Sequence, residues 1–238
     1  MLQERVIIVT GASRGLGRLM VQTLAERKAT VVAAARSLRS AQDKPEGAAL
    51  SISVDVRDQA QVRNLVQQVL DRYGRVDVLV NNAGLMIGDV PFTDTTPELW
   101  QAILDINLWG AFLCCQAVVP VMLHQHSGVI VNITSGAAVR TGFLNVPYGV
   151  SKAGLDRLTL GLGAELQQYG IACISLSPPV SATDTVRRLY PERDVDTWAQ
   201  PPELTARALC ALLADEPLQY TGQVLSVRDY LTRKGLLS

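Results

Sequence analysis

The sequence predicts an α/β fold, in which a doubly wound, mostly parallel β-sheet carries helices on both faces. Short apolar runs alternate with segments of helical periodicity along the whole chain, which is the pattern of strands joined by crossover helices. The first apolar run leads directly into a glycine-rich turn and a helix. No repeat, low-complexity tract or convincing linker interrupts this alternation. We therefore expect one domain over residues 1–238.

The expected strands are short and largely apolar, as strands covered on both faces of a sheet are. They are Val6–Val9, Thr30–Ala35, Leu50–Val54, Val76–Val80, Val129–Ile133, Ile171–Leu176 and Val224–Val227. The expected helices carry an apolar stripe. They run from the glycine turn through Ala25 and over Asp58–Tyr73, Pro97–His124, Val150–Tyr169 and Leu204–Leu213.

Two polar segments interrupt this series. Ser37–Ala48 is short and contains Pro45 and Gly47, so we expect a stunted helix or a loop there. Asp184–Gln200 is dense in charge and flanked by proline, and we interpret residues 184–200 as a mobile substrate lid.

The composition narrows the possible partners. The 238 residues are 48% hydrophobic and 18% charged, and 22 basic residues balance 22 acidic ones. This balance gives no support for nucleic acid or an anionic membrane as a partner. The four cysteines lie in apolar segments without a C-x-x-C pair, which indicates buried thiols in a reducing compartment. With only His124 and His126 available, we expect no metal site.

No targeting or membrane-spanning segment is expected. The apolar run Val6–Val9 is too short for a secretory signal. The longest apolar run, around Ala117–Leu123, contains Pro120, and we expect that it cannot span a bilayer. The sequence therefore predicts a cytoplasmic protein.

The glycine-rich turn after the first strand predicts a phosphate-binding site. It reads Thr10-Gly11-Ala12-Ser13-Arg14-Gly15-Leu16-Gly17. Glycines let backbone N–H groups approach a phosphate closely, and the start of the following helix adds positive potential. We expect the turn to hold a dinucleotide through Gly11, Ser13, Arg14, Gly15, Leu16 and Gly17.

The end of the second strand favours NADP(H) over NAD(H). An acidic residue there would bind the ribose 2′-hydroxyl of NAD, but this chain has Ala35 followed by Arg36. Arg14 in the glycine turn is a second cation that could reach the same place. Two guanidiniums without a carboxylate favour a 2′-phosphate. The alternative is that both arginines are simply solvated.

Tyr148 and Lys152 are the candidate proton-transfer pair. Their spacing of four residues places them on one face of the expected helix. A free phenol has a pKa near ~10, and an ammonium one turn away favours the phenolate. We therefore expect the pKa of Tyr148 to be lowered. The alternative is an amphipathic helix that carries a tyrosine and a lysine by chance.

Together these residues resemble the short-chain dehydrogenase/reductase family over nearly the whole chain. Thr10–Gly17 matches the family's T-G-x-x-x-G-x-G, and Asn81–Gly84 matches its N-N-A-G. Asn107 matches its helix asparagine, Ser135 its catalytic serine, and the tyrosine–lysine pair its Y-x-x-x-K. The order and spacing of these motifs are far more specific than any one of them. The chain resembles NADP-dependent members such as 3-oxoacyl-carrier-protein reductases.

The resemblance implies a Rossmann fold of seven strands in the order 3-2-1-4-5-6-7 and hydride transfer between nicotinamide and a carbonyl or secondary alcohol. Tyr148 would protonate the carbonyl oxygen, and Ser135 would hydrogen-bond the same atom. Lys152 would hold the nicotinamide ribose and lower the pKa of the tyrosine. Asn107 would steady a water that passes protons to Lys152, serve as a buried amide at a helix kink, or do both.

The resemblance also implies the remaining cofactor contacts. These are Asp55 and Val56 at the adenine, Asn82, Ala83 and Gly84 at the neighbouring ribose, and Pro178, Val180 and Thr183 near the nicotinamide. Pro179 departs from the family, which usually has glycine there, and a second proline removes a backbone donor and fixes φ. We expect the loop to follow a different path. The C-terminus lacks the usual Asp-Gly-Gly, so the expected homo-oligomer is either a dimer or a tetramer.

Two other functions fit fewer residues. Gly11–Gly15 matches the G-x-S-x-G motif of hydrolases, but this turn follows the very first strand and only His124 or His126 could act as the base. The other alternative is a non-catalytic NADP-binding sensor or scaffold with the same fold, and Pro179 is its only support.

The expected substrate pocket is apolar, which favours reduction of a lipophilic ketone or aldehyde. Its candidate residues are Leu85, Met86, Ile87, Ala137, Val139, Phe143, Leu144, Leu189, Tyr190 and Trp198. Acyl thioesters, quinones, sugars and simple ketones all remain open.

Overall fold

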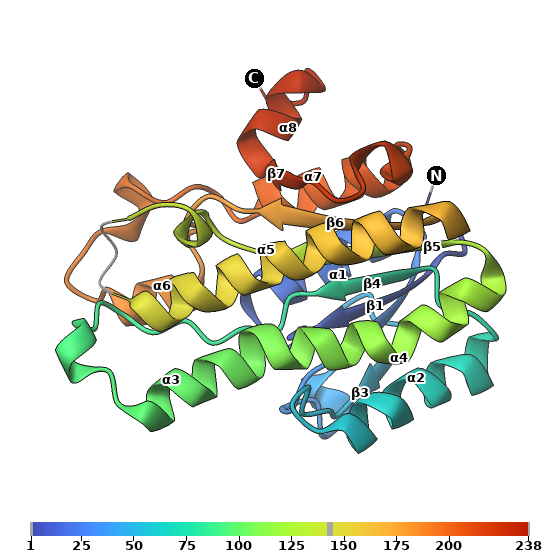
Figure 1. Ribbon diagram of the computed structural model, residues 1–238, viewed down its shortest axis with the longest axis horizontal. Helices are drawn as coiled ribbons and strands as arrows, with labels where there is room; N and C mark the ends of the chain where they lie inside the picture. The colour runs from blue at the N-terminus through green and yellow to red at the C-terminus, as the bar shows by residue number, and fades with distance from the viewer. Residues whose placement is uncertain (1, 142–144, 238) are drawn as a thin grey trace.

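A seven-stranded sheet forms the centre of the computed structural model, which describes residues 2–141 and 145–237 (Figure 1). The strands are β1 Val6–Thr10, β2 Thr30–Ala34, β3 Leu50–Ile52, β4 Val78–Asn81, β5 Gly128–Ile133, β6 Ile171–Ser177 and β7 Val224–Ser226. Their order is β3-β2-β1-β4-β5-β6-β7, and every pairing is parallel. The predicted α/β fold and strand order are confirmed, and the sheet is wholly rather than mostly parallel.

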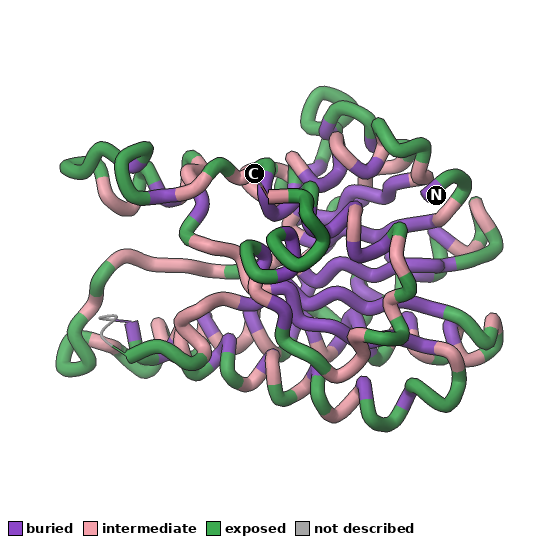
Figure 2. The backbone as a smooth tube through the Cα atoms, turned by 90° about the horizontal axis from the view of Figure 1, so that it is seen from above, coloured by how far each residue is buried: buried purple, intermediate pink, exposed green. Residues whose placement is uncertain are grey.

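Helices cover both faces of the sheet. They are α1 Gly15–Glu26, α2 Gln59–Tyr73, α3 Pro97–Leu104, α4 Gly110–Gln125, α5 Val146–Leu166, α6 Asp184–Leu189, α7 Glu203–Ala214 and α8 Val227–Arg233. A hydrophobic core lies on each face of the sheet. One is covered by α1, α7 and α8, and the other by α2, α4 and the end of α5. Figure 2 shows the strands as a buried layer between them.

Each strand supplies both cores, because successive side chains of a strand point to opposite faces. In β1, Ile7 and Val9 belong to the core under α1, while Val6 and Ile8 belong to the core under α2 and α4. All four side chains are buried, which explains why the strand reads as an unbroken apolar run rather than an alternating one.

Capping residues set helix starts that the apolar pattern leaves undefined. The side chain of Asn145 accepts a hydrogen bond from the Tyr148 N–H, so α5 begins at Val146 rather than at Val150. Ser226 caps α8, a short helix that the sequence analysis does not predict. Both corrections have the same cause, since caps act through local hydrogen bonds and not through hydrophobic periodicity.

The predicted helix Pro97–His124 consists of α3 and α4 joined by a π-helical turn, Asp105–Trp109. Such turns widen the helix locally and occur often at functional sites. Here the turn carries the buried Asn107.

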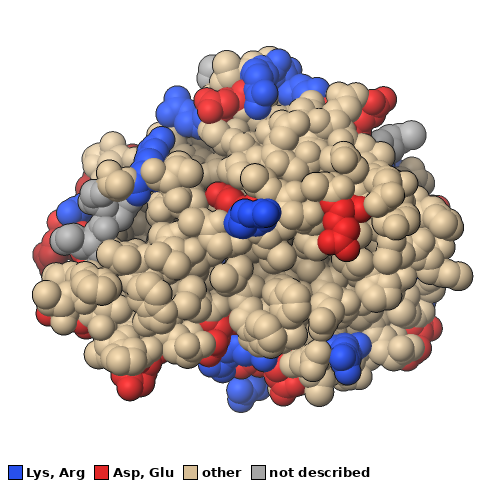
Figure 3. Space-filling model, viewed as in Figure 1, with Lys and Arg blue, Asp and Glu red and all other residues tan. Residues whose placement is uncertain are grey.

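The combined run Pro97–Gln125 is 29 residues long and apolar enough by composition to cross a membrane. Pro120 lies inside α4 without ending it, so the helix is longer than the apolar run around Ala117–Leu123. The core helix of a soluble protein passes the same test of length and composition. The inner side of α4 packs on the sheet through Leu113, Val118 and Met122. The outer face over α4 and α5 carries few charged side chains (Figure 3).

The two polar segments are both short folded structures. Ser37–Ala48 contains only the 3₁₀ turn Ala41–Asp43, in line with the expected loop. Asp184–Gln200, which we call the lid, contains α6 and the 3₁₀ turn Val195–Thr197. Side chains of the lid form a small hydrophobic cluster of their own with the loop after β4, built from Val186, Val195, Ala199, Met86, Ala182 and Tyr190.

Candidate active site

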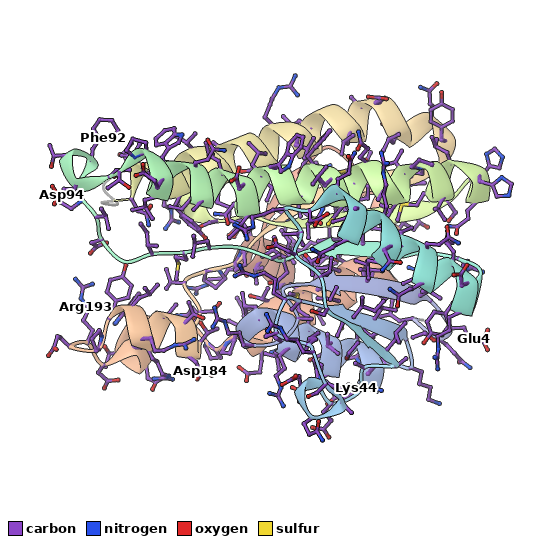
Figure 4. All side chains as sticks on the ribbon, turned by 90° about the horizontal axis from the view of Figure 1, so that it is seen from below. Glu4, Lys44, Phe92, Asp94, Asp184 and Arg193 are labelled. Carbon is purple, nitrogen blue, oxygen red and sulfur yellow. The ribbon has the colours of Figure 1, made fainter. Side chains whose placement is uncertain are left out.

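The loops that follow β1, β4 and β5 meet at the carboxyl ends of these strands, where ligands bind in doubly wound sheets. The lid and the loop before α3 extend beyond this end of the sheet. In Figure 4, Asp184 and Arg193 of the lid lie at the same end of the molecule as Phe92 and Asp94, away from Glu4 at the amino end of β1.

Hydrogen bonds lock the glycine turn to the loop after β4. The Thr10 hydroxyl accepts hydrogen bonds from the N–H groups of Asn82 and Ala83, both at 3.0 Å. The Asn82 amide donates to the carbonyls of Thr10 and Gly11 at 2.9 and 3.3 Å. Asn82 therefore holds the turn in place through its side-chain N–H groups.

The glycine turn packs so closely on neighbouring backbone that Gly11 and Gly17 have no room for a side chain. Gly11 has φ +64°, and a Cβ added there would lie 2.7 Å from the Ala83 Cα. A Cβ at Gly17 would collide with the Gly11 carbonyl. Arg14, at the N-cap of α1, supplies no side-chain hydrogen bond, and the first turn of α1 has no acidic residue. These features fit the diphosphate of a dinucleotide, because an anion can approach uncapped N–H groups at a helix start.

Arg36 and Asp55 lie together at the adenosine end predicted from the sequence. Arg36 is exposed, and its carbonyl accepts hydrogen bonds from Ser53 Oγ at 3.2 Å and Arg39 Nε at 3.3 Å. The hydrogen bond from Arg57 holds the pKa of Asp55 below its usual range, and the charge of Arg36 lowers it further. The Asp55 carboxylate is paired with Arg57 at 2.6 Å. Val56 is buried and packs against Gly110.

Lys152 is buried at the other end of the site, where it is 5% exposed. Its Nζ donates a hydrogen bond to the Ile133 carbonyl at 2.9 Å and lies 5.7 Å from the centre of the Tyr148 ring. Burial lowers the pKa of Lys152 to about 8, and the charge of Asp156 opposes this effect. The predicted pair is therefore brought together, with the amine close to its titration range at neutral pH.

The expected lowering of the Tyr148 pKa is wrong in this structure. Burial raises the pKa of Tyr148, and a hydrogen bond with Ser135 lowers it by less. Ser135 follows β5 directly, and its Oγ accepts a hydrogen bond from the Ala137 N–H at 3.2 Å. Desolvation of the phenol outweighs the Ser135 hydrogen bond, because burial disfavours the charged phenolate. Tyr148 is thus a neutral proton donor at pH 7.

Asn107 joins three elements around the pair. Its Oδ1 accepts a hydrogen bond from the Leu85 N–H at 2.6 Å, and its Nδ2 donates to the Leu85 carbonyl at 3.1 Å and to Ser151 Oγ at 3.0 Å. A Cβ added at Gly84 would lie 3.5 Å from Asn107 Oδ1 and 3.8 Å from Lys152 Nζ. The buried amide therefore ties the π-helical turn to α5 and to the loop after β4.

The loop after β6 turns back into the lid. Ser181 Oγ donates to the Pro179 carbonyl at 3.0 Å, and Ser181 bridges Gln200. The Val180 carbonyl accepts a hydrogen bond from the Gln200 N–H at 2.8 Å, and Thr183 caps α6. Pro178 and Pro179 thus lead into a lid whose two ends are tied together.

The expected pocket residues divide between two sides of the site. Met86 packs against the lid cluster together with Tyr190, whose hydroxyl donates to Asp89 at 3.3 Å. The rings of Tyr190 and Trp198 meet edge to face at 5.6 Å. Val139 is exposed. Phe143 and Leu144 lie outside the described residues.

Sequence reasoning missed several polar residues that build the site. Asn145 caps α5 and also donates to the Ile87 carbonyl at 3.0 Å, which ties α5 to the pocket loop. Ser151 Oγ donates to the Tyr148 carbonyl at 2.7 Å. Asp156 lies one turn beyond Lys152. The N-cap position of Asn145 before a proline-containing first turn is a signal that could have been found. The burial of Ser151 and of one carboxyl oxygen of Asp156 requires the tertiary structure.

The chain is similar to known dehydrogenases and reductases. The sequence profile described as short chain dehydrogenase matches residues 5–194. The 3-oxoacyl-[acyl-carrier-protein] reductase of Synechocystis sp. is 34% identical over 239 residues, covering 95% of this chain and 96% of that protein.

Two solved structures are similar over nearly their whole length. The 3-ketoacyl-(acyl-carrier-protein) reductase of Brucella melitensis complexed with NADH has a TM-score of 0.87 at 25% identity and covers 95% of this chain and 98% of that one. ElxO with NADP bound has a TM-score of 0.87 at 23% identity and covers 97% and 100%, a likeness that concerns the fold alone.

Proposed function

The chain belongs to the short chain dehydrogenase family of NAD(P)(H)-dependent oxidoreductases, and we propose that it is an NADP(H)-dependent reductase of lipophilic ketones or aldehydes. One observation carries the proposal: a neutral phenol, a buried ammonium and a serine hydroxyl converge beside a glycine turn suited to a dinucleotide diphosphate. The proposed site comprises the residues expected from the sequence, with Asn107, Ser135, Tyr148 and Lys152 at the reaction end.

The preference for NADP(H) rests on charge at the nucleotide end. Arg36 stands where a carboxylate would select the 2′-hydroxyl of NAD, and Arg14 begins the neighbouring helix. Asp55 does not take over the role of such a carboxylate, because its charge is paired with Arg57. Guanidiniums in solvent remain free to bind a 2′-phosphate. The NADH bound to the Brucella melitensis reductase belongs to that protein.

The protonation states favour reduction over oxidation. When bound, the nicotinamide supplies a hydride to the carbonyl carbon. The Tyr148 hydroxyl donates its proton to the carbonyl oxygen, and a raised pKa keeps that proton in place until the oxygen becomes basic. Ser135 donates a hydrogen bond to the same oxygen, and the Lys152 ammonium stabilises the phenolate that remains. Asn107 keeps Leu85 and Ser151 in position around this pair.

The substrate class follows from the lid. Residues 184–200 close one side of the site with the apolar cluster around Val186, and we propose that they act as the substrate lid of a single domain over residues 1–238. The apolar side chains expected at the pocket, such as Met86 and Trp198, suit an acyl or alkyl chain next to the carbonyl. The Synechocystis relative is named for a 3-oxoacyl group on a carrier protein, which belongs to this class of substrate.

Two copies of the chain are proposed to pair through α4 and α5. A groove of about 780 Å³ between these helices is lined by Leu104, Leu108, Trp109, Phe112, Leu158 and Leu162. Trp109 is 49% exposed and stacks on Phe112 at 5.0 Å. A two-fold interface would cover these rings. Light scattering of the native protein should give a homodimer or homotetramer, and the Trp109→Glu variant should be a monomer. A monomeric native protein would contradict the pairing.

We also propose that the protein is cytoplasmic.

The proposal is tested by a panel of ketones, aldehydes and 3-oxoacyl thioesters with NADPH or NADH, followed through nicotinamide absorbance. We expect consumption of NADPH with at least one lipophilic carbonyl, and slower consumption of NADH. Tight NADPH binding without turnover on any carbonyl would instead favour the sensor or scaffold. Faster turnover with NADH would overturn the cofactor preference.

A further inference from the structure

Asp156 is a partly buried acidic residue that the proposed mechanism does not use. It lies on α5 four residues after Lys152, so the two side chains occupy the same face of the helix one turn apart. That face packs on β5 and β6, and one carboxyl oxygen of Asp156 is buried without a hydrogen-bond partner. Burying a carboxylate in this way is unfavourable unless another interaction compensates.

The surroundings of Asp156 are polar but uncharged apart from Lys152. Hydroxyl groups of Thr134 and Ser175 lie beside the carboxyl and favour its ionised form, while burial raises its pKa. Ser175 Oγ is also hydrogen-bonded to Thr159 Oγ1 at 2.8 Å, and Thr159 accepts from Asn132 Nδ2 at 2.8 Å. This hydroxyl network lies next to the carboxyl, where α5 packs on β5 and β6. A neutral amide could fill the same space, so the network alone does not explain the charge.

The negative charge of Asp156 affects the protonation of Lys152. The described groups that face the ammonium are the Tyr148 ring and the Ile133 carbonyl, and Asn107 lies across Gly84. Asp156 is the charged side chain that favours the protonated form of Lys152 against the effect of burial. The carboxylate acts at a distance, because no ion pair within 4.0 Å joins the two side chains in the described part of the chain.

We propose that Asp156 is a positioning residue whose negative charge keeps the buried Lys152 ammonium protonated at neutral pH. The inference rests on the proposed function for its catalytic meaning, since a charged Lys152 is needed to stabilise the phenolate of Tyr148. Asp156 itself touches neither substrate nor cofactor in this scheme. It acts through the charge of Lys152.

The charge of Lys152 can be measured directly, because the chain has only four lysines, Lys28, Lys44, Lys152 and Lys234. Lysine labelled with ¹³C at Cε gives one NMR signal for each, and the Lys152 signal is assigned by its loss in Lys152→Arg. In Asp156→Asn we expect the titration midpoint of Lys152 to fall by about one pH unit. Asp71→Asn, which removes an exposed carboxylate on α2, should leave that midpoint unchanged.

Turnover gives a second readout that a merely structural role would not produce. With a substrate from the carbonyl panel, Asp156→Asn should match the native protein at pH 6, where Lys152 is protonated in both. At pH 8 its turnover should be about fivefold lower, as a midpoint about one pH unit lower requires. A loss that is equal at both pH values would indicate altered packing and overturn the inference.

The outcomes separate the two proposals. A shifted Lys152 midpoint in a protein that reduces no carbonyl would leave the role of Asp156 standing and defeat the proposed function. An unshifted midpoint in an active enzyme would do the reverse. If Asp156→Asn does not fold, Asp156→Ser serves instead: it removes the same negative charge with a smaller side chain, so the midpoint should fall by a similar amount. An unchanged midpoint in that variant would equally overturn the inference.

Discussion

The two ends of the candidate site use positive charge in opposite ways. Arg14 and Arg36 at the nucleotide end are exposed to solvent, whereas Lys152 at the reaction end is almost completely buried. An exposed guanidinium stays charged under all ordinary conditions. The charge of a buried ammonium depends on burial and on its neighbours, and here its pKa is lowered to about 8. The nucleotide end is therefore built to select a ligand, and the reaction end is built to respond to pH.

The largest expected effect lies at the reaction end. Tyr148→Phe removes the proton donor while keeping the ring, so we expect turnover to fall by about a thousandfold. NADPH affinity, measured by fluorescence titration, should change by less than about threefold, because binding depends mainly on the other end. Tyr169→Phe, at an exposed tyrosine beyond the end of α5, is the matched control and should retain activity. An equal loss of turnover in Tyr148→Phe and Tyr169→Phe would contradict a specific role for Tyr148 at the reaction end.

A smaller effect is expected at the nucleotide end. Arg36→Asp introduces the carboxylate that suits a ribose 2′-hydroxyl and repels a 2′-phosphate. We expect the ratio of NADPH to NADH affinity to fall by about 10- to 100-fold, the value of a charge-assisted contact. The turnover number with saturating cofactor should stay close to that of the native protein. Arg63→Asp on α2 makes the same charge change elsewhere, and an equal shift of the ratio in that variant would show a general charge effect instead.

The buried Lys152 and the exposed Arg36 should also differ in their effect on the free energy of unfolding. Burial lowers the pKa of Lys152 from 10.5 to about 8, which corresponds to about 3 kcal/mol of unfavourable free energy below pH 8. Lys152→Met should raise the free energy of unfolding at pH 7 by about 1 to 2 kcal/mol, since the hydrogen bond to Ile133 is lost as well. Arg36→Met should change it by less than about 0.5 kcal/mol.

The stability difference between Lys152→Met and the native protein should become smaller as the pH rises. Between pH 8 and 10.5 the unfolded native sequence holds more protons than the folded protein, so its stability rises with pH. The advantage of Lys152→Met should therefore be complete below pH 8 and disappear toward pH 10.5. Urea titrations at pH 7 and pH 10 measure both values. If the native protein were more stable than the variant at pH 7, the buried charge of Lys152 would not be destabilising.

The smallest effect concerns salt. Surface charges are screened as ionic strength rises, and buried ones much less. NADPH affinity should fall by about threefold between about 50 and 200 mM salt, while NADH affinity should change little. The same salt series should leave the titration midpoint of Lys152 unmoved. Equal salt dependence for the two cofactors would mean that the arginines do not reach the 2′-phosphate.

The sequence predicts much of this arrangement because parallel strands and phosphate turns depend on local patterns. Short, largely apolar runs identify all seven strands to within a few residues of their observed ends. The glycine turn is equally local, since Gly11 has a positive φ and Gly17 has no room for a Cβ. The strand order follows from the resemblance rather than from any single segment.

What the sequence does not predict depends on burial and on distant hydrogen bonds. The pKa of Tyr148 moves opposite to expectation, because helix spacing reveals the nearby lysine but not the desolvation of the ring. The π-helical turn around Asn107 and the continuous α4 through Pro120 depend on packing against the sheet. Asp156 reads as an ordinary helix residue until α5 is laid on β6, where its carboxyl becomes buried.

A crystal structure with NADP⁺ bound is the most direct test of the division between the two ends. We expect the 2′-phosphate to contact Arg36 or Arg14, and the nicotinamide to lie between Gly84 and the pair of Tyr148 and Lys152. A nucleotide bound in the opposite direction, or a 2′-phosphate facing solvent with Arg36 turned away, would contradict the account.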